Sequence, residues 1–499
     1  MAPGSATLAP MLVTWIAFGG YAAAAVFLGW LAHARRRRGT AYWTADRQLG
    51  AASVGLSISA GFLSISWSCV YAVQLFYWYG LGAIWLITVP WVLALGGIYL
   101  LSQRYHALPS FSQPEMVGRR FGVAAKRVVA LALFFVFLVW GGAEIYVAAK
   151  LLAPGLGVSV GAMILIIAVV VGAYATLGGF GAVVSTDKLQ YGVVVVYILA
   201  MGWLAWAGLQ RAFVDAVVVE SSGPLWFGLQ AMGARSAEPW SRLLAPGIAT
   251  IVLTFAAYLP GWIFETDLWL RVQAARDRGA ARRGIAIAMA NALVFVGILP
   301  LFIGVTALTI FPAGDGFAAE LGNEGDAIFV ALVENFAPAW LAVFVAVGLT
   351  AAAMSTIDTC TNVMALSLAY DLAEVREGPG AERWSQAATA FSVAAATLFA
   401  FNTASLWDIF YLSSGILTTT VAFPVAAVFL PWATSRMVTA SAATGFVATF
   451  AAYFLEAGGY LAGLQPAWLS DSGLGYILWG MGAAAIAAAV APMTARFKP

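Results

Sequence analysis

The chain is poor in charge. Of its 499 residues only 10% are charged, 62% are hydrophobic, and the mean hydropathy is +0.88. A soluble globular protein carries about 25% charged residues. The shortage therefore excludes a soluble globular protein and predicts one that crosses a membrane many times. The net charge of +2 gives no reason to expect a nucleic-acid partner.

Cysteine and histidine are also scarce, with two of each. Cys69 and Cys360 are expected toward opposite faces of the membrane, whereas a disulfide needs Cα atoms within about 7 Å. His33 and His106 fall between apolar stretches and are poor candidates for metal binding or catalysis. The sequence shows no nucleophile–base set, phosphate-binding loop or metal-ligand cluster, so we expect that the protein is not an enzyme.

Long apolar runs fill most of the chain. A helix needs about 20 apolar residues to span a bilayer, and thirteen such stretches predict an all-α membrane protein with about 13 transmembrane helices. They cover residues 10–33, 50–78, 80–103, 125–150, 157–178, 186–210, 244–270, 283–311, 338–371, 384–401, 405–431, 436–456 and 474–494. We interpret residues 1–499 as a single transmembrane domain whose first span is retained rather than cleaved as a signal peptide.

The basic residues orient these spans. If the N-terminus lies outside, all but four of the 25 lysines and arginines fall in cytoplasmic segments. The four exceptions are Lys150, Arg211, Arg235 and Arg242. The outer loops are acidic by contrast, as at 314–326. This distribution follows the positive-inside rule, predicts a cytoplasmic C-terminus, and is expected of a multi-pass protein of the cell inner (cytoplasmic) membrane.

One apolar span contains a polar face. Residues 350–362 read TAAAMSTIDTCTN, and Ser355, Asp358, Thr359 and Asn362 recur at the spacing of one helix face. Unpaired hydroxyl and carboxyl groups cost free energy in hydrocarbon, so this face is expected to turn toward the protein interior or a wet cavity. A row of hard oxygen donors beside small residues suits an alkali cation. The pattern therefore favours ion-coupled transport.

Two further spans contain residues that interrupt helices. The second reads ASVGLSISAGFLSISWSCV over 52–70, and the seventh carries Pro260 and Gly261. They are five spans apart and so cross in opposite directions. Paired interrupted helices are typical of inverted-repeat transporters, whose site lies at the breaks, although small residues can instead serve close helix packing. The predicted repeats cover 50–210 and 244–431, flanked by helices over 10–33 and 436–494.

Four segments resemble the sodium:solute symporter family. Two are similar to signatures of its fifth and eighth core helices, TLGGFGAVVSTDKLQ at 176–190 and GLTAAAMSTIDT at 348–359. The others, PSFSQPEMVGRRFG at 109–122 and LRVQAARD at 270–277, resemble cytoplasmic segments. The resemblance covers roughly 42–435. It implies a leucine-transporter-like 5+5 inverted repeat with flanking helices, and sodium-coupled import of a small organic solute by alternating access.

The same resemblance implies where sodium binds. The family's principal sodium site uses two backbone carbonyls at the break of the first core helix, and these match Gly55 and Ile58. It also uses a carbonyl and two hydroxyls of the eighth core helix, which match Ala352, Ser355 and Thr356. This set offers five oxygens without a formal anion.

Some family members have a second sodium site, which matches Asp187, Ser355, Asp358 and Thr359. Asp358 stands where the family often has serine, so its carboxylate is an alternative carrier of a proton. Asp187 has a structural alternative. It follows Ser185 at an expected helix start, where capping and the helix dipole alone favour an acid.

The solute-binding residues are matched less closely. The resemblance places Tyr258, Trp262 and Thr266 where some members contact solute or close the inner gate. Further polar candidates are Gln74, Glu144 and Ser413.

The acidic residues near these positions have alternative interpretations. Glu144 lies roughly 19 residues into its span, about 28 Å along a helix, which would put it at the outer interface. Glu265 and Asp267 fall near a cytoplasmic end, where Asp267 is expected to pair with Arg271 four residues later.

These observations leave alternatives to a sodium symporter. A proton-coupled symporter follows if Asp358 titrates. A sensor with the transporter fold would pass a signal through a separate partner, and a membrane enzyme or channel is the third possibility. The expected partners are a small organic solute and the lipid bilayer, with sodium as the coupling ion, and no obligate protein partner is evident.

Overall fold

The computed structural model describes residues 5–35, 41–219, 241–311, 326–376, 380–402 and 406–492. Across these ranges the chain is helical, and the pairing of Leu49 with Ala275 is an isolated β-bridge. Eight of the described helices are long and apolar enough to cross a membrane, and a bent pair raises the number to nine. The protein is therefore a multi-pass membrane protein.

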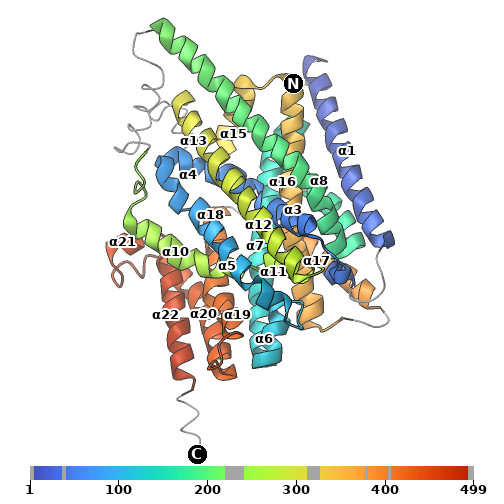
Figure 1. Ribbon diagram of the computed structural model, residues 1–499. Helices are drawn as coiled ribbons and strands as arrows, with labels where there is room; N and C mark the ends of the chain where they lie inside the picture. Colours follow the sequence, from blue (N-terminus) through green and yellow to red (C-terminus); the bar gives the residue numbers. More distant parts are fainter. Residues whose placement is uncertain are drawn as a thin grey trace, which may run out of the picture.

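Figure 1 shows how the described helices are arranged in space. They are α1 (Ser5–Arg35), α2 (Ala41–Thr44), η1 (Ala45–Arg47), α3 (Ala51–Phe62), η2 (Ile65–Tyr71), α4 (Ala72–Tyr79), η3 (Gly80–Trp85), α5 (Thr88–His106), α6 (Gln113–Phe121), α7 (Val123–Leu156), α8 (Val160–Val219), α10 (Ile248–Ile263), α11 (Thr266–Gln273), α12 (Arg278–Ala292), η4 (Leu293–Ile298), α13 (Leu299–Ile310), α15 (Asp326–Phe336), α16 (Ala339–Ala365), η5 (Leu366–Leu372), α17 (Ala381–Asn402), α18 (Leu406–Ile416), η6 (Leu417–Ala422), α19 (Phe423–Ala427), α20 (Ser435–Ala457), α21 (Ala467–Ser470) and α22 (Gly475–Val490). Each of the thirteen predicted stretches falls mainly on helix. The number of crossings and the orientation stay predictions.

Two of the predicted spans are parts of one element, α8, and meet at a kink. Gly179 there has φ 59° and ψ −151°, a conformation that residues with a Cβ rarely adopt. A Cβ at this position would also lie 2.5 Å from the carbonyl oxygen of Tyr42. Glycine therefore permits both the kink and the close approach of the α2 segment.

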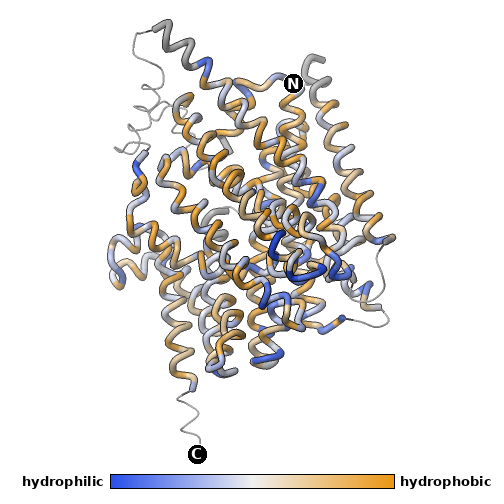
Figure 2. The backbone as a smooth tube through the Cα atoms, in the orientation of Figure 1, coloured by the Kyte–Doolittle hydropathy of each residue, from blue (hydrophilic) through white to orange (hydrophobic). Residues whose placement is uncertain are grey.

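The bundle places α3 near its centre. This helix packs against α8, α12 and α16, while α1 packs on α8 and α20 pairs with α22. In Figure 1 α1 begins at the top and α22 ends at the bottom, so the described part of the chain begins and ends at opposite sides of the bundle. Figure 2 shows the tube mostly hydrophobic, with hydrophilic stretches gathered low in the view around α6, α11 and the start of α12.

The first interrupted helix breaks later than its glycines predict. α3 is continuous to Phe62, the chain departs from helix at Leu63 and Ser64, and the segment from Ile65 turns by 70°. The Ser64 hydroxyl accepts a hydrogen bond from the backbone N–H of Trp67 at 2.9 Å and so caps the next turn. Position 55 therefore lies well inside a regular helix.

The second interrupted helix also breaks later than predicted. α10 runs through Pro260 and Gly261 to Ile263, and α11 begins at Thr266. The Gly261 N–H donates a hydrogen bond to the Thr418 hydroxyl at 3.1 Å. Side-chain hydroxyls of this kind can satisfy backbone groups that a proline leaves without a helical partner. The prediction of a break at Pro260 and Gly261 is wrong by a few residues.

A polar cluster at the start of α6 ties it to the end of η5. The Glu115 carboxylate accepts hydrogen bonds from the Phe111 N–H at 2.8 Å, from Arg119 at 2.8 Å and from Arg376 at 3.0 Å. Burial acts to raise the pKa of Glu115, but these hydrogen bonds and charges outweigh it and hold the pKa below its usual value. The charged form of this residue therefore stabilises the folded protein.

We expect Glu115→Gln to lower the stability at neutral pH by about 1–3 kcal/mol, the usual cost of losing hydrogen bonds to a charged group. A carboxyl with a depressed folded pKa contributes fully above its unfolded pKa of about 4.3 and loses that contribution as the pH falls through the lower folded value. The gap between variant and wild type should therefore close in acid. Thermal unfolding of purified protein at several pH values measures this. Glu382→Gln, at a side chain 52% exposed, is the control, and a gap independent of pH would contradict the assignment.

Candidate functional site

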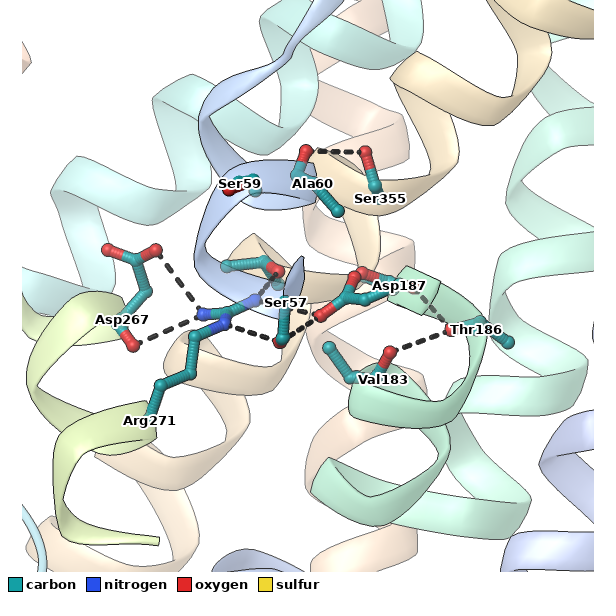
Figure 3. A network of polar contacts seen from close by, with 12 residues as sticks. Ser57, Ser59, Ala60, Val183, Thr186, Asp187, Asp267, Arg271 and Ser355 are labelled. Atoms are coloured by element: carbon teal, nitrogen blue, oxygen red, sulfur yellow. Dashed lines mark hydrogen bonds and ion pairs between the residues drawn. The ribbon is translucent and has the colours of Figure 1, made fainter. Parts of the chain in front are cut away.

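The end of α3 offers backbone oxygens to α16. The last carbonyls of a helix have no partner within that helix. The Ser355 hydroxyl oxygen lies 3.0 Å from the carbonyl oxygen of Ala60 and 2.8 Å from that of Ala352. The Thr356 hydroxyl oxygen lies 3.3 Å from the carbonyl of Gly61 and 3.4 Å from that of Ala352. Five uncharged oxygens thus meet where α3 ends against α16, as Figure 3 shows for Ala60 and Ser355.

The electrostatics of this crossing favour a cation. A helix carries partial negative charge at its C-terminal end, and α3 ends here at Phe62. Ser355 is fully buried, so its hydroxyl is shielded from water. The five oxygen atoms are therefore chemically suitable ligands for a small alkali ion.

Gly55 and Ile58 do not belong to this meeting point. The carbonyl of Gly55 accepts a hydrogen bond from the Ser59 hydroxyl at 2.7 Å. A Cβ on Gly55 would lie 2.7 Å from the carbonyl oxygen of Gly284, so this residue faces α12. The structure corrects the match of Gly55 and Ile58 to the helix break, because the break occurs several residues later and brings Ala60 and Gly61 to α16 instead.

A buried guanidinium lies among the residues matched to the second ion site. Arg271 is 1% exposed, and its Nη2 lies 3.2 Å from the Asp187 carboxylate and 2.8 Å from the Thr359 hydroxyl. Its Nε donates to the Ser57 hydroxyl at 2.7 Å, and its Nη1 lies 3.3 Å from the Asp267 carboxylate. The predicted pair of Asp267 and Arg271 is confirmed, but Arg271 also joins α11 to α3, α8 and α16 (Figure 3).

Asp358 has other hydrogen-bond partners than that cluster. Its Oδ2 accepts hydrogen bonds from the Tyr174 hydroxyl at 2.7 Å and from the Thr186 hydroxyl at 3.3 Å. Asp187 is not at a helix start, because α8 continues through it and the Ser185 hydroxyl donates back to the Gly181 carbonyl. The capping explanation for Asp187 is therefore wrong, and its partner is the arginine.

A cavity adjoins the end of α3. The space between its lining atoms, including the part open to solvent, is about 480 Å³. The cavity lies between the two helix breaks, α5, α7 and α16. Its lining residues are Gly61, Phe62, Ser64, Ser66, Trp67, Trp91, Trp140, Glu144, Trp262, Glu265 and Thr356. Gly61 and Thr356 thus take part in both the oxygen cluster and the cavity wall.

Two carboxyl groups line the cavity. Glu144 is 2% exposed and accepts hydrogen bonds from the N–H and hydroxyl of Ser66 through Oε1. The Oε2 atoms of Glu144 and of Glu265 have no hydrogen-bond partner in the described part of the chain. The prediction that Glu144 lies at the outer interface is wrong, because α7 has 34 residues and its middle packs beside η2. Glu265, expected near a cytoplasmic end, lies at the second helix break.

Tryptophan side chains form much of the remaining wall. The rings of Trp91 and Trp262 stack at 5.5 Å with an angle of 5° between them. Trp67 meets Trp262 edge-on at 5.5 Å, and Trp140 completes the set. Sequence reasoning missed Trp67, Trp91 and Trp140. These residues lie inside apolar spans rather than at the span ends, where aromatic belts lie. That position could have indicated that they line an internal site.

The predicted solute residues separate into two groups. Glu144 and Trp262 line the cavity, and Tyr258 stacks on Trp262 at 5.5 Å without being part of the lining. The Thr266 hydroxyl donates a hydrogen bond to the Gln113 side chain. Thr266 is buried and is not one of the lining residues. Gln74 and Ser413 are buried on α4 and α18 and are also outside the lining.

A helical membrane protein whose two interrupted helices meet at a polar, partly aromatic cavity has the architecture of a secondary transporter. The model of the sodium:solute symporter family matches residues 42–443. The chain belongs to this family. In fold it is similar to a Na⁺-coupled sialic acid symporter solved in a substrate-bound outward-open state, with a TM-score of 0.73, 15% identity, and coverage of 96% of this chain and 97% of that one.

Curated relatives match parts of the chain. A putative sodium-dependent multivitamin transporter of Drosophila melanogaster is 26% identical over 247 residues, which are 49% of this chain and 39% of the relative. The human sodium/iodide cotransporter is 29% identical over 183 residues, 36% of this chain and 27% of the relative. The matches therefore span less than half the length of either relative.

Proposed function

We propose that this protein is a sodium-coupled symporter that imports a small organic solute across the cytoplasmic membrane by alternating access. One observation carries the proposal. Uncharged oxygens of Ala60, Gly61, Ala352, Ser355 and Thr356 meet at the end of α3, beside a cavity between two helix breaks. Membership of the sodium:solute symporter family supports sodium as the ion.

The binding of sodium and of solute would be coupled because the two sites share residues. Thr356 and Gly61 belong to both the oxygen cluster and the cavity. An ion that holds α3 against α16 would also order this part of the solute site, and a bound solute would in turn favour the arrangement that holds the ion. Such linkage is reciprocal and requires that both ligands prefer the same conformation.

The proposal includes one sodium ion for each transport cycle. Arg271 places a fixed positive charge beside Asp187 and Thr359, where a second ion would need those oxygens. A proton at Asp358 remains the alternative coupling ion, because this carboxyl group is fully buried and has no basic partner among the described residues. Uptake at fixed pH that needs sodium and ignores a proton gradient would exclude that alternative.

We expect Thr356→Val to weaken sodium binding at least ten-fold, because valine keeps the shape of threonine but removes one ion ligand. Binding of ²²Na⁺ to purified protein measures this without knowledge of the solute. Wild-type binding should saturate near one ion per chain.

The matched control is Thr361→Val on the same helix. The Thr361 hydroxyl donates only to the α16 carbonyls of Ile357, at 2.9 Å, and Asp358, at 3.1 Å. This variant should keep the wild-type affinity. Equal sodium affinity in both variants, or saturation at two ions, would contradict the proposed site.

Measurement of solute uptake distinguishes a symporter from a sensor with the same fold. Purified protein in liposomes should accumulate solute against its gradient when sodium is present outside, whereas a sensor would bind solute without accumulating it. The names of the relatives refer to vitamins, iodide and sialic acid, which are chemically unlike one another. The solute class must therefore come from the cavity itself.

A further inference from the structure

The cavity described above contains two carboxyl groups and no basic side chain. Glu144 and Glu265 line it, and no lysine, arginine or histidine is among its lining residues. The Oε1 atom of Glu144 accepts hydrogen bonds from the Ser66 N–H and hydroxyl, which are neutral groups. The Oε2 atoms of Glu144 and Glu265 have no hydrogen-bond partner within the described ranges. A buried carboxylate is costly unless a positive charge or several hydrogen bonds compensate it. The cavity thus lacks a cation.

The buried cation Arg271 is outside the lining and already has two acidic partners. The guanidinium of Arg271 lies between the carboxylates of Asp187 and Asp267, at 3.2 and 3.3 Å. Its charge is already opposed by these two acids. An anionic solute would therefore meet repulsion from Glu144 and Glu265, and a cationic solute would meet attraction.

The walls favour an organic cation over a second metal ion. Trp67, Trp91, Trp140 and Trp262 supply aromatic faces rather than oxygen ligands. Tryptophan is the strongest aromatic partner for an ammonium group, because its ring face carries partial negative charge. These rings give an organic cation contacts that a bare sodium ion, which needs oxygen ligands, would not use.

The hydroxyl groups of the lining are mostly engaged, which disfavours a polyhydroxylated solute. The Ser66 hydroxyl donates to Glu144, and the Ser64 hydroxyl accepts from the Trp67 N–H at 2.9 Å. Thr356 contacts the Gly61 carbonyl at 3.3 Å.

We infer that the transported solute is a small organic cation, an amine or quaternary ammonium ion, whose charge lies against Glu144 and Glu265 and whose alkyl groups pack on the tryptophans. The inference rests on the proposed function, because it takes this cavity as the solute site. It deepens that function by naming the chemical class of the solute.

The test compares probes that differ in charge at nearly constant shape. Choline, ethanolamine, the uncharged choline isostere 3,3-dimethylbutan-1-ol, and lactate are titrated into the purified full chain in sodium buffer, with tryptophan fluorescence and calorimetry as readouts. At least one ammonium probe should bind ten-fold or more tightly than the isostere, and lactate should not bind. The choline and ethanolamine arms distinguish a quaternary from a primary ammonium site. Equal affinity for the isostere, preference for lactate, or no ammonium binding up to about 10 mM would overturn the inference.

Variants locate the interaction. Glu144→Gln should weaken ammonium binding at least ten-fold, while Glu374→Gln, whose side chain is 62% exposed and pairs with Lys126 outside the cavity, should leave it unchanged. Trp262→Phe keeps an aromatic face and should weaken binding only a few-fold. Retained ²²Na⁺ binding by each variant shows that it is folded. Ammonium affinity that is unchanged in a folded Glu144→Gln protein would overturn the inference.

The two readouts separate this inference from the proposed function. Ammonium binding that ignores sodium would leave the solute class standing and remove sodium coupling. Sodium binding at Thr356 without ammonium binding would do the reverse.

Discussion

Arg271→Gln is expected to be the most damaging single substitution in the described part of the protein. The side chain is 1% exposed and lies between Asp187 and Asp267. Removing one partner from a buried ion pair typically costs about 3–5 kcal/mol, because the remaining charge is left uncompensated. Thermal unfolding should therefore begin many degrees lower, and solute uptake should be lost, since the same guanidinium ties α11 to α3 at Ser57.

The double variant Arg271→Gln with Asp187→Asn tests the cause. It removes both partners of one ion pair, so part of the lost stability should return. The effects of the two single substitutions should not be additive, because the residues are in contact. Arg276→Gln is the matched control, since Arg276 is 56% exposed and pairs with Asp277 at the surface, where ion pairs contribute little. An Arg271→Gln protein as stable as this control would refute the buried ion-pair assignment.

Gly55→Ala is expected to have the second largest effect, and to act through packing. The added Cβ would lie 2.7 Å from the carbonyl oxygen of Gly284 and 2.8 Å from the Cβ of Ile287. α3 and α12 would have to separate, and overpacking of this kind typically costs about 1–3 kcal/mol. The fall in unfolding temperature should be accompanied by reduced sodium affinity, because α3 also carries the carbonyls that meet α16.

Gly284→Ala should have a similar effect, since its Cβ would lie 2.6 Å from the Cβ of Val54 across the same crossing. The two substitutions together should cost less than the sum of their separate effects, because one separation of the helices relieves both contacts. Gly192→Ala, with no atom within 4 Å of its new Cβ, is the control and should be neutral or slightly stabilising. Comparable losses in all three variants would mean that helix packing at Gly55 is not the cause.

The polar side of α16 was predictable, whereas its partner was not. Ser355, Asp358 and Thr359 follow the period of one helix face, and the cost of unpaired polar groups in hydrocarbon turns that face inward. The break in α3 lies at Leu63 and Ser64, but the sequence around it contains several glycines and serines with similar local preferences. Which of them bends the chain and which permits close packing depends on the neighbouring helix, and here Gly55 faces Gly284.

The acidic residues show the same division. The pair of Asp267 and Arg271 is local, four residues apart on α11, and could be read from spacing. The contact of Arg271 with Asp187 joins residues 84 positions apart, so no local pattern indicates it. Glu144 was misplaced because depth along a helix was taken as depth in the membrane, and a helix of 34 residues extends beyond a bilayer about 30 Å thick.

The sequence by itself determined that the chain is a multi-pass helical membrane protein, that it resembles sodium:solute symporters, and that one helix presents an oxygen-rich face. These properties follow from composition and from short periodic patterns, which are local. Only the tertiary structure decided that the end of α3 brings Ala60 and Gly61 to that face, that Arg271 lies among the residues matched to a second ion, and that two carboxyl groups share a cavity with four tryptophans. Such contacts depend on helix crossings and on where each helix breaks, and packing between distant segments sets both.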